Sequence, residues 1–250
     1  MNDNYTIKEG YDLPSKGLIY SKPVKSHVEL RSMTTRDEMR RTSPSNTPYK
    51  NLAELIESCM IEKPAIHVYD MCLGDYEYLL HKLRVVTYGS SYKMAVGCPH
   101  CGNVFDMTVD LDTLEVKKFS KEEFENALIV ELPVSGHRIT LKYQTPRILD
   151  EIELRSKELS KKAKGGDYRA VVSLQLAIDT VDGNKLSVMD LEEFVYNLPQ
   201  RDSNKILNTL TKLNKMVGLD TEIVTKCTSC GGEILTFFRF GPEFFRPSED

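Results

Sequence analysis

The chain has 250 residues, of which 40% are hydrophobic and 28% are charged, a composition ordinary for a globular protein. Its 33 basic and 37 acidic residues give a net charge of −4, which weighs against a protein that binds nucleic acid mainly through phosphates. The longest apolar run, Ala127–Val130, is far shorter than the ~20 residues that span a bilayer. The first residues lack the basic start and apolar block of a secretory signal. We therefore expect the protein to stay in a reducing cytoplasm, where its cysteines act as thiols or metal ligands.

Residues 1–50 contain many turn signals, among them the segments LPSKG and SPSNTP. Between these segments HVELRSM alternates as a strand does, and Thr35 with Glu38 forms a capping-box pattern. We expect residues 1–50 to form an extended N-terminal arm with one short helix.

Residues 51–90 are predicted to form a helical segment. Apolar side chains recur on one face of Asn51–Met60 and again on one face of Leu73–Gly89. Cys59 and Cys72 fall in these helical neighbourhoods, where a lone cysteine usually behaves as a small core residue. We expect neither of them to bind a metal.

The apolar period changes twice in the rest of the chain. From Tyr92 the apolar residues repeat every two positions, as in strands. Thr145 and Pro146 are suited to the cap and the first residue of a helix, and the period after them is 3.6. From Leu219 the period is two again. The pattern predicts an α+β fold with an α-rich N-terminal part. In it, residues 91–144 and 219–250 form a small antiparallel β region, and residues 145–218 form an inserted helical subdomain.

Four cysteines indicate a metal site within that β region. Cys98 and Cys101 form one Cys-x-x-Cys-Gly turn, and Cys227 and Cys230 form a second. The two-residue gap lets both thiolates of a pair face one ion, and the glycine permits the tight turn. Matched pairs with strands on both sides predict a split zinc ribbon with four cysteine ligands. Since no ligand position is left for water, we expect one structural zinc ion and no catalytic one.

The two cysteine pairs are unusually far apart in the sequence. Residues 102–226 separate them, where a simple ribbon has ~15–20 residues. Because the entropy of loop closure grows only logarithmically with length, a folded insert with adjacent ends is compatible with one shared site.

Two other ligand sets can be written for the same region. His100 lies inside the first pair and could replace a thiolate, although a solvent-facing or supporting role suits it better. The sequence His27-Val28-Glu29 followed by Cys-x-x-Cys is similar to the zinc deaminase signature, but the proline follows the first cysteine and the second pair has no role there. The sequence carries no other pattern typical of catalysis.

Four segments then occur in a family-specific order: LPSKGLIY, LGDYEYLLHKLRVVTYG, GLDTEIVTKCTSCGGE and FFRP. Together they resemble the baseplate hub and hub-assembly family of contractile-tailed, T-even-type bacteriophages. The resemblance implies a tail-assembly protein with other hub proteins as its partners, which is either built into the hub or is an assembly factor able to leave it. Since the sequence shows no active-site pattern and a closed metal site, we expect a non-enzymatic protein that works by contact. Its place would be the host cytoplasm during assembly and, for a part that stays, the virion.

The aromatic C-terminal segment has two interpretations. Phe244, Phe245 and Arg246 are residue types enriched at binding hot spots, which favours a partner-binding tail. Equally, the two phenylalanines can fold back on the protein's own β region. The function class also has an alternative, a cytoplasmic zinc-ribbon protein that binds nucleic acid. The acidic charge balance and the lack of aromatic residues interleaved with Lys and Arg near the cysteines weigh against it.

Overall fold

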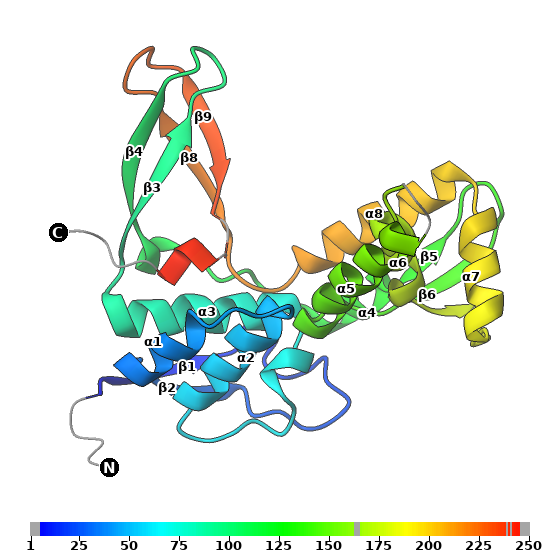
Figure 1. Ribbon diagram of the computed structural model, residues 1–250, viewed down its shortest axis with the longest axis horizontal. Helices are drawn as coiled ribbons and strands as arrows, with labels where there is room; N and C mark the ends of the chain where they lie inside the picture. The colour runs from blue at the N-terminus through cyan, green and yellow to red at the C-terminus, as the bar shows by residue number, and fades with distance from the viewer. Residues whose placement is uncertain (1–5, 163–165, 239, 241, 246–250) are drawn as a thin grey trace.

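The chain folds into a body, a stalk and an arm, which can be followed in Figure 1. The computed structural model describes residues 6–162, 166–238, 240 and 242–245. The body comprises residues 6–90 and 242–245, the stalk consists of two β-hairpins, and the arm comprises residues 117–218. Small antiparallel sheets combined with helices confirm the α+β class. Among the described residues, no helix is long and apolar enough to cross a membrane.

The body is built from one hairpin and a layer of helices. Its elements are β1 (Lys8–Asp12), β2 (His27–Arg31), α1 (Thr35–Arg41), α2 (Pro48–Cys59), the 3₁₀ turn η2 (Val68–Asp70), α3 (Leu73–Tyr88) and the C-terminal 3₁₀ turn η4 (Pro242–Phe245). β1 and β2 pair antiparallel, from Lys8 opposite Arg31 to Asp12 opposite His27. The predicted capping box of α1 is real but lies one residue earlier, because Thr34 is the N-cap and Asp37 its partner.

Within the described residues, 6–50 do not form the extended N-terminal segment that the sequence predicted. Leu13, Val28 and Leu30 are buried in the same core as the apolar faces of α2 and α3. The alternation of β2 places Val28 and Leu30 on one face of the strand, where burial against α3 removes their apolar surface from water. Most buried residues within 6–90 therefore share one hydrophobic core, while Cys72 belongs to the core of the arm.

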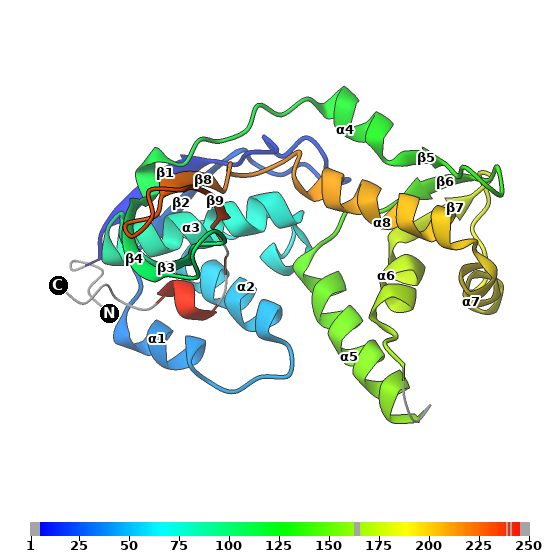
Figure 2. The ribbon, with the colours of Figure 1, turned by 90° about the horizontal axis from the view of Figure 1, so that it is seen from above.

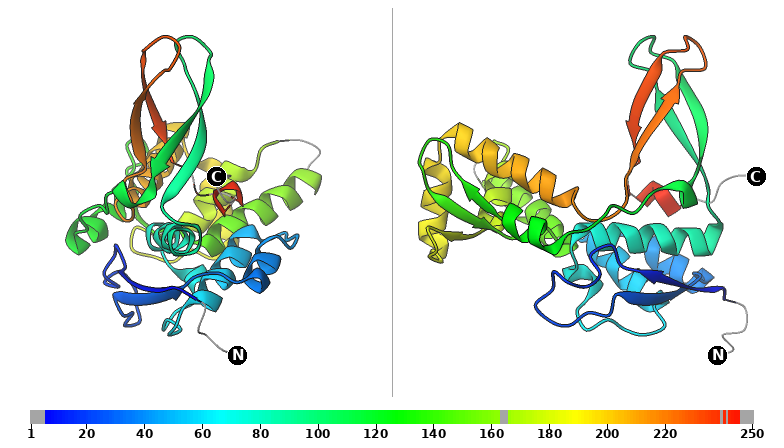
Figure 3. Two further views of the ribbon diagram at one scale, coloured as in Figure 1. Left: turned by 90° about the vertical axis from the view of Figure 1, so that its left-hand side faces the viewer. Right: turned by 180° about the vertical axis from the view of Figure 1, so that it is seen from behind.

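The stalk consists of two antiparallel hairpins. β3 (Ser91–Gly97) pairs with β4 (Val104–Asp110), and β8 (Glu222–Lys226) pairs with β9 (Glu233–Phe237). A short 3₁₀ turn, η3 (Leu111–Thr113), follows β4. In the view along α3 in Figure 3 (left), the stalk stands above this helix, and β1 and β2 lie below it. Both hairpin turns lie at the tip of the stalk, far from the body.

The arm combines helices with a three-stranded sheet. Its elements are α4 (Lys121–Ala127), β5 (Ile129–Glu131), β6 (Arg138–Leu141), α5 (Pro146–Lys162), α6 (Arg169–Ala177), β7 (Ile178–Val181), α7 (Val188–Asn197) and α8 (Gln200–Asn214). The strand order is β5-β6-β7. Figure 2 shows the arm extending from one end of α3, with the stalk seen end-on above the body.

The boundary of the insert differs from the predicted residue 145. β5 and β6 share a hydrophobic core with α8, and β6 pairs with β7, so these strands belong to the arm and not to the stalk. The two ends of the arm meet in a short antiparallel contact. There the Lys117 N–H donates to the Gly218 carbonyl (2.9 Å) and the Asp220 N–H donates to the Glu115 carbonyl (2.8 Å). The ends of the insert are adjacent, which is compatible with one site shared by the two cysteine pairs.

The arm is fastened to the body through Asp150 on α5. Its carboxylate is buried and accepts from the N–H groups of Tyr49 (3.3 Å) and Lys50 (2.9 Å) in the first turn of α2. The Tyr69 hydroxyl donates to the same carboxylate at 3.0 Å. Since Thr47 makes no side-chain cap, a residue of the arm completes a helix of the body.

Candidate metal centre

The turns at the tip of the stalk bring four cysteine sulfurs together. Cys98 Sγ lies 3.7 Å from Cys230 Sγ, Cys101 Sγ lies 3.7 Å from Cys227 Sγ, and all four sulfurs are within 4.8 Å of one another. A tetrahedral ion with metal–sulfur bonds of ~2.3 Å requires sulfur–sulfur edges of about 3.8 Å. A disulfide would instead require ~2.05 Å. The spacing therefore fits four thiolates around one ion.

The two turns have the same backbone geometry. The Cys98 N–H donates to Asn103 O (2.8 Å), and the Gly102 N–H donates back to Cys98 O (3.0 Å). In the second turn Cys227 makes the equivalent bonds with Gly232 O (2.9 Å) and the Gly231 N–H (3.0 Å). Both Gly102 and Gly231 have φ +72°, the left-handed region in which glycine carries no steric penalty.

The hydrogen bonds of the turns prepare the thiols for a cation. Backbone N–H groups of Cys230 and Ser229 lower the pKa of Cys227 to about 6. At Cys101 an N–H of Asn103 acts in the same direction, but the neighbouring thiols, Cys230 first, raise its pKa to about 12. Successive deprotonation of crowded sulfurs accumulates negative charge, which a divalent cation neutralises. With four protein ligands, such a site is closed to substrate.

His100 connects the two hairpins and is not among the clustered ligands. Its Nε2 donates to the carbonyl of Glu233, 3.0 Å away in the other hairpin. The ring also lies over Gly232, where a Cβ atom would be only 2.7 Å from His100 Cδ2. This position supports the second turn from outside the sulfur cluster. His27 lies in the body, paired with Asp12 (2.9 Å), and the deaminase interpretation therefore fails on geometry.

The proposed partner-binding tail is corrected by the structure. Phe244 and Phe245 are 1% and 0% exposed and pack into the core of the body. Arg84 of α3, itself fully buried, donates from Nε to the Phe244 carbonyl at 2.9 Å, and its guanidinium lies over the Phe244 ring. The two rings therefore fold back on their own chain, against α3 as well as the stalk strands. Arg246 lies outside the described residues.

Cys59 and Cys72 are buried single thiols, far from the cluster in the fold. Burial raises the pKa of Cys59 to about 11 and raises the pKa of Cys72 further. Protonated thiols of this kind behave as small apolar side chains.

A buried polar cluster that was not predicted from the sequence joins two of the quoted motifs. Asp75, from LGDYEY, is fully buried and accepts from the Ser15 N–H (2.9 Å) and Ser15 hydroxyl of LPSKG. The Tyr20 hydroxyl donates to the same carboxylate at 2.6 Å. Burial raises the pKa of Asp75, and the hydrogen bonds of Ser15 and Tyr20 oppose this shift. The available signal was the position of an acid four residues before Leu79, on the buried face of an apolar helix.

The polar clusters found in the described residues fasten elements to one another: the cysteines join two hairpins, Asp150 joins arm to body, and Asp75 joins a loop to α3. Each of these clusters therefore has a structural task within the fold. A family model described as T4 bacteriophage base plate protein matches residues 6–246, and the chain belongs to this family. Searches of curated proteins and of solved structures returned no match. The family indicates a structural, non-enzymatic role among the proteins of a phage tail baseplate.

Proposed function

We propose that this protein is a component or assembly factor of the baseplate hub that acts through contacts with other hub proteins and holds one structural zinc ion. The family match over residues 6–246 is the observation that supports a role in the baseplate. The resemblance of the quoted segments to hub and hub-assembly proteins supports the finer assignment. On this proposal the protein is present in the host cytoplasm during assembly, and in the virion if it stays in the hub.

The zinc ion has a defined structural task in this proposal. The stalk buries a small cluster of Val96, Cys98, Cys227 and Ile234, and Val109 nearer its base, which together supply little hydrophobic stabilisation. Its two hairpins are also separate in the sequence and form separate sheets. Cys98, Cys101, Cys227 and Cys230 would hold the ion, which would contribute the Lewis-acid cross-link between the hairpins.

The experiment is a complementation assay with phage that lack this protein. Loss of hub-containing baseplates, seen by electron microscopy and restored by the wild-type chain, is the expected result. Immunoblots of purified tails then separate a resident hub part from an assembly factor that leaves. Normal baseplates in its absence would overturn the proposal. Retention on immobilised DNA that falls with salt would instead favour the nucleic-acid alternative.

A further inference from the structure

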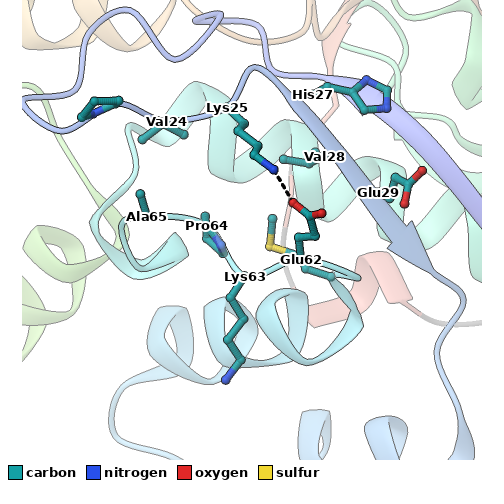
Figure 4. A pocket seen from close by; sticks show the side chains of 11 residues that line it. Val24, Lys25, His27, Val28, Glu29, Glu62, Lys63, Pro64 and Ala65 are labelled. Atoms are coloured by element: carbon teal, nitrogen blue, oxygen red, sulfur yellow. Dashed lines mark hydrogen bonds and ion pairs between the residues drawn. The ribbon is translucent and has the colours of Figure 1, made fainter.

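A groove of about 520 Å³ lies beside β2 in the body. Its lining includes Val24, Val28 and Met60, so the bottom is apolar. Figure 4 shows the groove between β2 with its preceding loop and the segment that contains Pro64 and Ala65. What this groove can bind depends on the backbone groups that β2 directs toward it.

Hydrogen bonds at both ends of the β1–β2 pair show which backbone groups face outward. The Leu13 N–H donates to the Ser26 carbonyl (2.8 Å) at one end, and the Ser32 N–H donates to the Ile7 carbonyl (2.8 Å) at the other. Backbone groups alternate between the two sides of an antiparallel strand. The even-numbered residues of β2 therefore bond to β1, and the odd-numbered residues direct their N–H and C=O groups away from it.

This outward edge of β2 is half occupied by the chain itself. The Ile61 N–H donates to the Glu29 carbonyl (3.0 Å), and Leu30 forms an antiparallel bridge with Met60. No further bridge extends this pairing past Met60 within the described residues. Among the described residues, the Glu29 N–H has no hydrogen-bond acceptor, and the outward N–H and C=O of His27 have no hydrogen-bond partner. The free half of the edge is the half that borders the groove.

A single ion pair spans the groove. Lys25 from one wall and Glu62 from the other approach to 2.5 Å, as the dashed line in Figure 4 shows, and both side chains are largely exposed. Exposed pairs of this kind contribute little to stability and exchange readily for other partners. The pair therefore presents one positive and one negative group to any polypeptide that enters.

We propose that the groove receives an extended segment of another baseplate protein, which adds to β2 as a short antiparallel strand. The segment continues the line of Met60 and Ile61, and its backbone pairs with His27 and Glu29. One apolar side chain of the segment covers Val28 and Met60, and an acidic and a basic side chain replace the Lys25–Glu62 contact. A helix or a flat surface would leave the edge N–H and C=O groups unpaired. The inference rests on the proposed function, because it takes the partner from the baseplate.

The probe is an array of overlapping synthetic peptides that cover the other baseplate proteins of the same phage, with binding measured by fluorescence anisotropy. Glu29→Pro is the test variant, because it removes the outward N–H and places its ring in the groove while the carbonyl to Ile61 remains. Glu29→Ala is the matched control, which keeps the N–H. Circular dichroism of each variant reports folding.

We expect at least one peptide to bind the wild type, Glu29→Ala to keep the affinity, and Glu29→Pro to weaken it at least about tenfold. In the wild-type complex, hydrogen exchange at the amides of His27 and Glu29 should slow at least about tenfold, independently of any variant. Absence of a binding peptide, equal affinity in Glu29→Pro, or unchanged exchange at both amides would overturn the groove proposal. If phage with Glu29→Pro still assemble hubs that require this protein, the proposed strand addition in the groove is wrong, while the proposed function is still supported.

Discussion

At the residue scale, the four clustered sulfurs separate two kinds of cysteine in one chain. We expect Cys59→Ser and Cys72→Ser each to retain about one zinc per chain and to lose roughly 1–2 kcal/mol of stability, as for a modest core change. Cys101→Ser should lose the metal, because it removes a ligand from a closed site. Elemental analysis of proteins expressed with ample zinc measures the outcome. Zinc lost with Cys59 or Cys72, or retained without Cys101, would contradict the assigned ligand set.

His81, also a single residue, makes a pH-dependent contribution to the free energy of unfolding. The side chain is fully buried in α3 and bonds to the Leu111 carbonyl at 3.0 Å. Burial lowers its pKa to about 4, from about 6.5 in an unfolded chain. Between these values the unfolded state binds more protons, so this contribution to stability is lost as the pH falls from 6.5 towards 4.

His81→Gln should therefore flatten this part of the pH dependence, by up to roughly 3 kcal/mol relative to the wild type. Urea unfolding at several pH values measures the difference, with the exposed His67→Gln as control. The comparison with wild type is essential because burial raises the pKa of Asp75 and of Glu77, which act in the opposite direction. Parallel curves for His81→Gln and wild type would show that His81 does not contribute.

At the element scale, the first turn of α2 is capped by Asp150, a residue of the arm that lies one hundred positions after Lys50 in the sequence. Asp150→Ala leaves the N–H groups of Tyr49 and Lys50 and the Tyr69 hydroxyl without their acceptor. We expect a loss of about 1–3 kcal/mol, the range for a lost cap or an unsatisfied buried group. Asp150→Asn keeps one acceptor oxygen and should lose less, and the exposed Glu54→Ala on α2 is the control. Urea unfolding within error of wild type for Asp150→Ala would contradict this role.

Elements with a clear period were predictable, and their tertiary placement was not. The cysteine spacing and flanking strands indicated the cluster, since the local turn fixes two ligands at a time. The period of LAIDTV does not distinguish the end of α6 from the start of β7, because β7 exists only through pairing with β6. Likewise, nothing local in FF determines whether Phe244 faces solvent or Arg84. That choice depends on a long-range contact that sequence periodicity does not encode.

At the scale of the whole molecule, the stalk should be the part that responds to loss of the metal. Structural zinc contributes ~10–16 kcal/mol of apparent binding free energy in small modules, comparable to the ~5–15 kcal/mol stability of a domain. The buried cores of the body and the arm do not include the four clustered cysteines, so Cys227→Ser should loosen the stalk and keep most of the helical content.

The expected phenotype of Cys227→Ser is failure of tail assembly with a largely helical circular dichroism spectrum. Complementation of phage that lack the protein scores assembly, and Cys59→Ser serves as the matched cysteine control. Normal assembly by a Cys227→Ser protein shown to lack zinc would make the metal site dispensable for assembly.

The insertion of the arm between the two hairpins also sets an order of events on the ribosome. Cys98 and Cys101 emerge early, but the second half of their site follows only after the whole arm has been synthesised. Phe244 and Phe245, which complete the core of the body, emerge later still. A nascent chain that stops within the arm therefore lacks the second hairpin of the stalk and the contribution of Phe244 and Phe245 to the body core. Chains released within the arm thus leave the thiols of Cys98 and Cys101 without their partners and the core of the body without its last aromatic side chains.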